Sequence, residues 1–536
     1  MKKVIALLLA LTLVFSLAAC SAKQETPPPE EAPSDKTPTE EAAPATEPAE
    51  EPAEEPAQES GSAKILDVAS TDTIDDFNPF TNQQTVFLCL MNTNCLETLI
   101  YMNDAMEYTP SLATEWEISP DGLTYTFKLR EGVKYHDGTD FTSEDVKFTL
   151  ETTVDEATGA WRQPNFATIT NIDCPDDYTV VLTLSNPTPA LLDSFTTLPI
   201  TSSEQDPATY STTPIGTGAF KFVSYSTNDN ITFEKFDDYW DAGNVKLDGY
   251  VIHFSADLST AINSLKAGDL DLVTLLDASY AKNIEETEGL SVVKSPTSNT
   301  TYLMEIGLHN REEFRNPDVL KAMFMCLDTQ TIADQVFYGY ATPSKGVVHA
   351  GAKYYTEAYA DITYDVDAAA ALLATTPYAS GFEFELPNLG GAYETIAVIW
   401  QQDLAKIGIT LKISTDEMSV WLEKYLGRTY DMIANGYSMV GTDPATFMSL
   451  IIGGLYDYQC SEDIIPGLRE KIDAAAATAV DAEREEMYAE IFDILAEYMP
   501  VYTYLCVDNL CAASDNLSGV IFNGEARYIF TYADIA

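Results

Sequence analysis

A low-complexity run from Ser21 to Ala63, which is almost entirely Pro, Glu, Ala and Thr, marks where the part of this chain that can fold begins. The run has no aromatic or large aliphatic residue, and its twelve acids against two lysines give a formal charge of −10. Such a segment cannot bury enough apolar surface to offset its ordering entropy, so we expect a disordered, extended tether. The 473 residues from Lys64 to Ala536 then form the globular body. This is too long for one core, and we expect at least two lobes.

The first twenty residues have the features of a lipoprotein signal peptide. Lys2 and Lys3 precede an apolar run from Val4 to Phe15 that is too short for a comfortable membrane span. In "LAAC", Leu17 to Cys20, small residues stand directly before a cysteine, which is the lipobox pattern. We predict that residues 1–20 are a signal peptide, that Cys20 becomes lipid-modified, and that the protein is anchored to the outer face of the cytoplasmic membrane. The alternative is an ordinary secretory signal with a chance cysteine.

The charge of the body argues against several classes of partner. The whole chain has a formal charge of −55, and −47 remains once the tether's −10 and the leader's +2 are set aside. A surface this acidic repels phosphate backbones and anionic lipid headgroups, so nucleic-acid binding is not expected. The simplest explanation for the excess of acidic residues is that they keep the surface of the body hydrated.

Cysteine and histidine spacing points to neither a metal nor a cofactor. Seven cysteines follow Cys20, an odd number, so at least one is free or bonded to another molecule. The closest pairs, Cys89/Cys95 and Cys506/Cys511, lack the CxxC spacing of zinc and redox sites. The four histidines are far apart and none lies in an HExxH pattern: His136, His253, His309 and His349.

Short strands and helices alternate along the body, which favours an α/β fold. Period-two patterns predict strands at 124–130, 178–184 and 430–437, and a hairpin over 220–236. Helical spacing and capping residues predict helices that begin near Thr142 and Asp257, and others over 396–404 and 418–426. The strand at 430–437 leads into "GYSMVGTDPATF", Gly436 to Phe447. Ligands in open α/β sheets bind beyond the carboxyl ends of strands, so this motif lies where a site is expected.

Several segments, in order, resemble the extracellular solute-binding proteins of family 5, which serve ATP-driven importers of peptides and nickel. The segment from Pro110 to Glu151, "PSLATEWEISPDGLTYTFKLREGVKYHDGTDFTSEDVKFTLE", is similar to the family signature almost without interruption. Further similar segments are "DDFNPF", "PIGTGAFKFVSY", "DDYWDAGNVKLDGYVIHF", "LKAGDLDLV", "NPDVLKAMFMCLDTQTIADQVFYGYATP", "IWQQDLAKIGITLKI" and the 500–504 region. The resemblance therefore spans nearly all of the body.

This resemblance implies a type II periplasmic-binding-protein fold, in which two α/β lobes joined by two crossings close over a ligand. We place lobe I at 64–300 with an extra subdomain at about 100–205, lobe II at 301–503, and the return to lobe I at 504–536. The crossings are expected near 297–305 and 502–507. His136 and Asp137 belong to the turn of the signature and are expected to be structural. The implied partners are an ABC permease and its ATPase subunits, and we expect a monomer.

The segment Gly436 to Phe447 contains a serine between glycines, as hydrolase motifs do, but its spacing does not fit a hydrolase. A nucleophile elbow is GxSxG, whereas Ser438 is followed by glycine one residue late, at Gly441. No histidine lies within eighty residues of Ser438. We therefore expect a binder without catalytic residues, and a secreted hydrolase using Ser438 is the unfavoured alternative.

The resemblance also indicates where a ligand binds. In the family's peptide binders the matching loop is Gly-Trp-x-x-Asp, and its acid pairs with the peptide's α-amino group. Tyr437 stands at the tryptophan position and Val440 at the acid position, while Asp443 directly precedes Pro444. We therefore expect little discrimination between free and acetylated peptide amines, unless another acid such as Asp443 supplies the counter-ion. The predicted ligand-binding residues are Asn299, Trp421, Tyr437, Ser438, Met439, Val440 and Asp443.

The ligand is predicted to be a peptide or a related small solute. An oligosaccharide or a metal chelate in the same fold is the alternative, since aromatic platforms also bind sugars. Trp421 and Trp400 are candidates for such a platform, but Trp400 lies on a helical stripe and is expected in the core.

Overall fold

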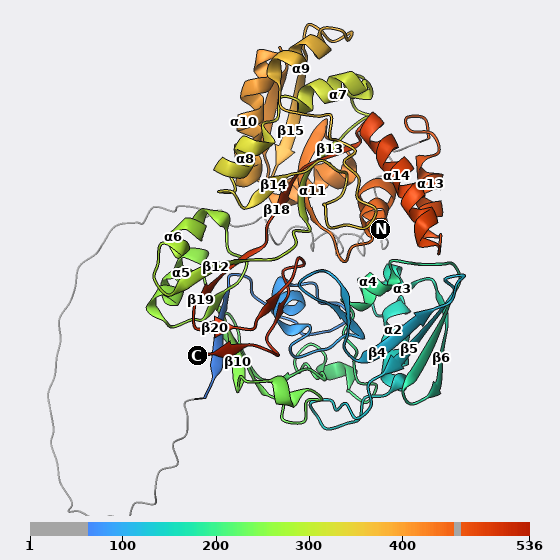
Figure 1. The fold of residues 1–536 in the computed structure, drawn as a ribbon, viewed down its shortest axis with the longest axis vertical. Coiled ribbons are helices and arrows are strands. Elements are labelled where there is room, and N and C mark those ends of the chain that lie inside the picture. The colour runs from blue at the N-terminus through green and yellow to red at the C-terminus, as the bar shows by residue number, and fades with distance from the viewer. Residues whose placement is uncertain (1–62, 455–461) are drawn as a thin grey trace, which may run out of the picture.

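The computed structural model describes residues 63–454 and 462–536 and contains two α/β bodies, each built on its own sheet (Figure 1). The leader, the acidic tether, Cys20 and Cys460 lie outside the described residues. Within the described part, no helix is both long and apolar enough to span a membrane. The six cysteines found there are all free.

The first body contains a mixed seven-stranded sheet. β1 is parallel to both β10 and β11, and the outer strands on each side are antiparallel. Helix α5 (Leu258–Ala267) packs its apolar stripe on one face of this sheet. Asp257 caps that helix at its start, as the sequence predicts, and Gly268 ends it in the left-handed conformation. In spatial order the strands are β12 (Leu290–Lys294), β19 (Leu510–Ser514), β11 (Leu272–Val273), β1 (Ile65–Ser70), β10 (Gly249–Phe254), β9 (Asn230–Lys235) and β8 (Phe220–Ser226).

A second, antiparallel sheet extends the first body and contains the Pro110 to Glu151 signature. Its order is β4 (Ala113–Ile118), β5 (Thr124–Leu129), β7 (Thr179–Leu184) and β6 (Ile169–Asp176). The helices beside it are α2 (Ser143–Val154), α3 (Gln163–Phe166) and α4 (Leu191–Phe195). Thr142 and Asp145 form the expected capping box of α2. His136 contacts the Gly218 carbonyl at 2.9 Å, so it holds two segments of this body together.

The second body is built on an antiparallel sheet flanked by helices. Its strand order is β14 (Ala341–Pro343), β18 (Val501–Val507), β13 (Thr300–Ile306) and β17 (Met432–Ser438), and β15 (Glu383–Asn388) pairs in parallel with β16 (Thr410–Thr415). The helices are α7 (Pro317–Phe324), α8 (Thr329–Gln335), α9 (Val366–Leu373), α10 (Ala392–Lys406), α11 (Met418–Gly427), α12 (Pro444–Phe447), α13 (Leu468–Ala476) and α14 (Asp481–Tyr498). Trp400 is fully buried, stacks on Phe324 and donates to the Met323 carbonyl at 2.9 Å. Its expected place in the core is confirmed.

Smaller elements complete the structure. Helix α6 (Ala281–Glu285) precedes β12, and 3₁₀ and π turns connect several of the larger elements. The short strand pairs are β2 (Ile100–Met102) with β3 (Tyr108–Pro110), β20 (Leu517–Ser518) with β23 (Asp534–Ile535), and β21 (Ile521–Phe522) with β22 (Tyr528–Ile529).

The chain passes between the two bodies twice, at 295–299 and at 508–509. The two passages are adjacent, because Thr300 at the start of β13 is the register partner of Val507 at the end of β18. The amide of Ser295 donates to the Asn509 carbonyl at 3.0 Å, which joins the passages to each other. β18 stays paired in the second sheet up to Val507, so the second body extends beyond residue 503, where we expected it to end.

Candidate functional site

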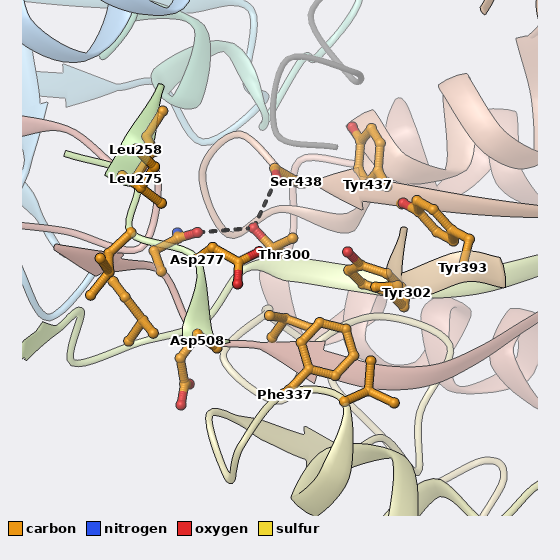
Figure 2. A pocket seen from close by; sticks show the side chains of 18 of the residues that line it. Leu258, Leu275, Asp277, Thr300, Tyr302, Phe337, Tyr393, Tyr437, Ser438 and Asp508 are labelled. Carbon is orange, nitrogen blue, oxygen red and sulfur yellow. Dashed lines mark hydrogen bonds between the residues drawn. The ribbon is translucent and has the colours of Figure 1, made fainter. Parts of the chain in front are cut away.

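A cavity of about 300 Å³ lies where the two bodies meet, beside the two chain passages. Figure 2 shows aromatic side chains on one side of it and aliphatic and acidic side chains on another. From the first body it is lined by Thr71, Asp72, Leu258, Leu275, Leu276, Asp277, Ala278, Asp508, Asn509 and Leu510. From the second body it is lined by Thr300, Tyr302, Val336, Phe337, Ala392, Tyr393, Gly436, Tyr437, Ser438 and Val507.

The aromatic wall comes from separate elements of the second body. Tyr302 on β13 stacks on Tyr393 at the start of α10, with ring centroids 4.7 Å apart, and meets Phe337 edge-on at 5.1 Å (Figure 2). Burial raises the pKa of Tyr302 to about 12, so its hydroxyl stays protonated. A Cβ on Gly436 would lie 2.4 Å from the Tyr393 hydroxyl, so the glycine of the "GYSMVG" motif makes room for this ring.

Ser438 lies at the end of β17, where the aromatic wall meets the chain passages. Its hydroxyl is hydrogen-bonded to the Thr300 hydroxyl at 2.9 Å, and Thr300 in turn donates to Asn509 at 3.3 Å (Figure 2). The partner of Ser438 is thus another hydroxyl and not a general base. This arrangement suits a polar contact in a binding site.

A smaller cavity of about 100 Å³ continues from the first and shares Leu275, Ser438 and Asn509 with it. Its remaining lining residues are Gln83, Thr85, Leu88, Cys89, Asn299, Met439, Val440, Glu525, Ala526 and Arg527. Val440 therefore lines a cavity, at the position where the resemblance places an amine-binding acid.

Asp443 is occupied by structural contacts. Its carboxylate accepts from the Ala445 amide at 3.0 Å and so caps α12. The same carboxylate receives two hydrogen bonds from the Arg484 guanidinium, at 2.6 and 2.8 Å, and both side chains are almost completely buried. A bidentate pair of this kind fixes the loop after β17 to helix α14.

That loop also contacts the first body directly. The Gly441 amide donates to Glu525 at 2.7 Å, and the Asp443 amide donates to Asp193 at 3.1 Å. Tyr108 donates its hydroxyl to the same Asp193 carboxylate at 2.6 Å. Burial is the main reason that the pKa of Asp193 rises to about 7. These bonds join the two bodies, and the bond to Glu525 lies beside the smaller cavity, which Glu525 lines.

Most, but not all, of the predicted site residues line one of the two cavities. Tyr437 and Ser438 line the main cavity, while Ser438, Met439, Val440 and Asn299 line the smaller one. Asp443 and Trp421 line neither. Trp421 is fully buried in the second body and stacks on Tyr425 at 4.5 Å, so it is a core residue in this structure.

The sequence analysis did not identify the other aromatic residues of the wall or Asp72. Tyr302 lies in a segment that we expected to be a crossing, and Tyr393 is the second residue of α10, two residues after the Gly390-Gly391 turn. A search for aromatic residues next to predicted crossings and helix starts could have found both. No group of three or more metal-ligating side chains occurs among residues 63–454 and 462–536.

Comparison with known proteins identifies the family. The model of the bacterial extracellular solute-binding proteins, family 5 (middle region), matches residues 107–457. The glutathione-binding protein GsiB of Shigella flexneri is 26% identical over 457 residues, which cover 82% of this chain and 88% of GsiB.

Solved structures share the fold. The ABC transporter substrate-binding protein CtaP of Listeria monocytogenes superposes with a TM-score of 0.79 at 24% identity, over 88% of this chain and 99% of CtaP. DppA of Helicobacter pylori, solved with the peptide STSA, gives a TM-score of 0.72 at 23% identity, over 88% and 98% of the two chains. The expected α/β periplasmic-binding-protein fold is thereby confirmed. The chain belongs to the bacterial extracellular solute-binding proteins of family 5, and it is a solute-binding protein outside the cytoplasm rather than an enzyme.

Proposed function

We propose that this protein captures a short peptide or a peptide-like solute between its two bodies and delivers it to an ABC permease. The bodies act as lobes: lobe I is residues 64–300 with the returning C-terminal segment, and its subdomain spans about 100–205. Lobe II is residues 301–507, between the two chain passages. The protein works as a monomer at the permease.

The observation that carries this proposal is a cavity whose walls come from both bodies. A ligand in such a cavity contacts both walls only when the bodies are together, so binding favours closure. A volume of about 300 Å³ is at the lower end for small-ligand sites, which favours a short ligand. The named ligands of the relatives, glutathione and the peptide STSA, belong to the same chemical class.

The loop after β17 supports closure as the mode of binding. Its amides at Gly441 and Asp443 bond to carboxylates of the first body, at Glu525 and Asp193. These bonds break when the bodies separate. Bound solute therefore stabilises a set of protein–protein contacts as well as its own.

The experiment is native mass spectrometry of the purified protein, followed by calorimetry and X-ray scattering with the solute that it carries. We expect a bound peptide-like mass, a smaller radius of gyration on binding, and a raised melting temperature. Ser438→Trp fills the junction of the two cavities and should abolish binding. Val420→Trp, at an exposed position of α11, is the matched control and should bind normally.

Two results would contradict the proposal. One is a bound oligosaccharide or metal chelate with no affinity for peptides, which would assign a different solute to the same cavity. The other is normal binding by Ser438→Trp, which would place the ligand elsewhere.

A further inference from the structure

We propose that the solute carries a protonated amine or a guanidinium group, and that Asp72 of the first body is its counter-ion. This inference rests on the proposed function and adds the chemical class of the ligand and the residue that selects it. The position that the resemblance assigns to the amine-binding acid holds Val440, so the charge has to come from another part of the cavity.

All charged side chains of the described residues that line the main cavity are acidic. They are Asp72, Asp277 and Asp508, and no lysine, arginine or histidine of residues 63–454 and 462–536 lines it. The long-range field has the same sign, because the body's formal charge is strongly negative. A cationic group is therefore attracted and a purely anionic solute is repelled.

Two of the three carboxylates already have a role in the protein. Asp508 is paired with Lys294 at 2.8 Å and accepts from the Ser298 hydroxyl, beside a chain passage. Asp277 accepts from the Ser279 amide at 2.8 Å, where it caps a short 3₁₀ turn, and it is exposed to solvent. Neither carboxylate needs a cationic ligand to stabilise its charge.

Asp72 differs from both. It is half-buried, and among the described residues it forms no ion pair. Its side chain is hydrogen-bonded to Thr85, and burial raises its pKa, because the charged form loses water without gaining a cation. A half-buried carboxylate in this state is stabilised by any cation that reaches it.

A second, independent observation points to an N–H donor in the adjoining smaller cavity. Asn299 is 1% exposed and donates its amide to the Met439 carbonyl at 2.5 Å, but its Oδ1 has no hydrogen-bond partner. It lines the smaller cavity together with Thr85, the partner of Asp72. A buried acceptor without a donor is costly, and an ammonium, guanidinium or peptide N–H supplies one.

Arg527, which lines the smaller cavity, does not cancel this preference for a cationic solute. Arg527 is engaged with Glu525 at 2.8 Å and donates to the Thr196 carbonyl at 2.7 Å. It is therefore not available for an anionic group of the solute. Tyr302 and Tyr437 also line the main cavity, and aromatic rings of this kind attract a cation.

The probe is a tryptic digest of casein, used untreated and after complete acetylation of its amines. Untreated peptides offer ammonium and guanidinium groups, whereas acetylated peptides offer guanidinium groups only. Bound species are read by native mass spectrometry, and the best-bound peptide is then synthesised, free and acetylated, for calorimetry. Asp72→Asn keeps the size and the Thr85 contact but removes the charge. Asp277→Asn removes a charge from the same cavity and keeps a capping residue.

We expect the wild type to retain peptides whose cation fits the cavity, and acetylation to remove every bound species except those that contain arginine. Asp72→Asn should weaken the cationic peptide by about 30-fold or more, as for a buried charge pair that loses one partner. Asp277→Asn should stay within about threefold. The unliganded melting temperature checks folding of both variants, and the acetylation comparison decides the question in the wild type alone.

Equal retention of peptides without any cation would overturn this inference and leave peptide capture intact. The same holds if Asp72→Asn folds and binds as the wild type does. If no peptide and no copurified solute is retained at all, the proposed function fails together with the inference.

Discussion

Replacing Gly441 by alanine should block closure of the two bodies while leaving each body folded. Gly441 has a φ of +68°, and a Cβ at this position would lie 2.0 Å from the Cγ of Asp193 in the other body. Asp193 cannot move away without cost, because Tyr108 and the Asp443 amide both bond to its carboxylate. The clash exists only when the bodies are together.

The magnitude follows from the bonds that the clash removes. The Gly441 amide to Glu525 and the Asp443 amide to Asp193 are both bonds to carboxylates. Each such bond contributes roughly 1.5–3 kcal/mol, so losing both costs about 3–6 kcal/mol in the closed form. The open form bears only the strain of a left-handed alanine, about 1–2 kcal/mol. Solute affinity should therefore fall by about 10²-fold or more.

The assay is calorimetry with the solute that copurifies with the wild type, combined with X-ray scattering. Gly132→Ala is the matched control, because Gly132 has a φ of +75° and no atom within 4 Å of the added Cβ. Both variants bear the same backbone strain, and Gly441→Ala alone should lose affinity and stay extended when solute is added. Wild-type affinity for Gly441→Ala would show that the interbody bonds contribute nothing to closure. An equal loss of affinity in both variants would show that the strain of a left-handed alanine causes it, and not the lost interbody bonds.

Three further outcomes are expected. Burial raises the pKa of Asp193 to about 7 in the closed form, and opening exposes its carboxylate to more water and lowers that pKa, so closure takes up a proton. Solute affinity should thus rise from pH 8 to pH 6 in calorimetry, by at most about tenfold, and Asp193→Asn should be insensitive to pH; a wild-type affinity that falls on acidification would contradict this. Arg484→Met leaves Asp443 buried without its cation and should lower the free energy of unfolding by about 3–5 kcal/mol in denaturant titration, whereas an unchanged midpoint would mean that the pair is not buried in solution. Alkyne fatty acid should label the wild type in cells and not Cys20→Ala; equal labelling of both would exclude a lipid on Cys20.

Local structure was predictable wherever neighbouring residues determine it. The capping box of α2 needs only Thr142 and Asp145, three residues apart, and α5 needs only a cap at Asp257 and a glycine at 268. These signals act within one turn of chain and do not depend on the rest of the fold. A strand was predicted at 430–437, β17 is Met432–Ser438, and it leads to the cavity as expected.

The composition of the cavity depends on distant residues, so local patterns could not give it. Trp421 and Trp400 both follow helical spacing, and only the packing of the second body shows that both are core residues. Asp443 was a candidate anchor because of its place before Pro444, but its partner Arg484 lies on another helix, 41 residues away. Asp72 gave no signal, because only the three-dimensional structure shows that it lines the cavity without an ion pair among the described residues.

The two chain passages leave the second body at one point, since Thr300 and Val507 are register partners on adjacent strands. The line through them is a natural rotation axis, and a rotation displaces each atom in proportion to its distance from the axis. The cavity is lined by Thr300, Val507 and Asn509, so its walls near the axis move little. The contact between Gly122 and Ala479 lies on the opposite side, where α13 and α14 face the subdomain, and there the bodies separate most (Figure 1). A solute therefore enters from the subdomain side.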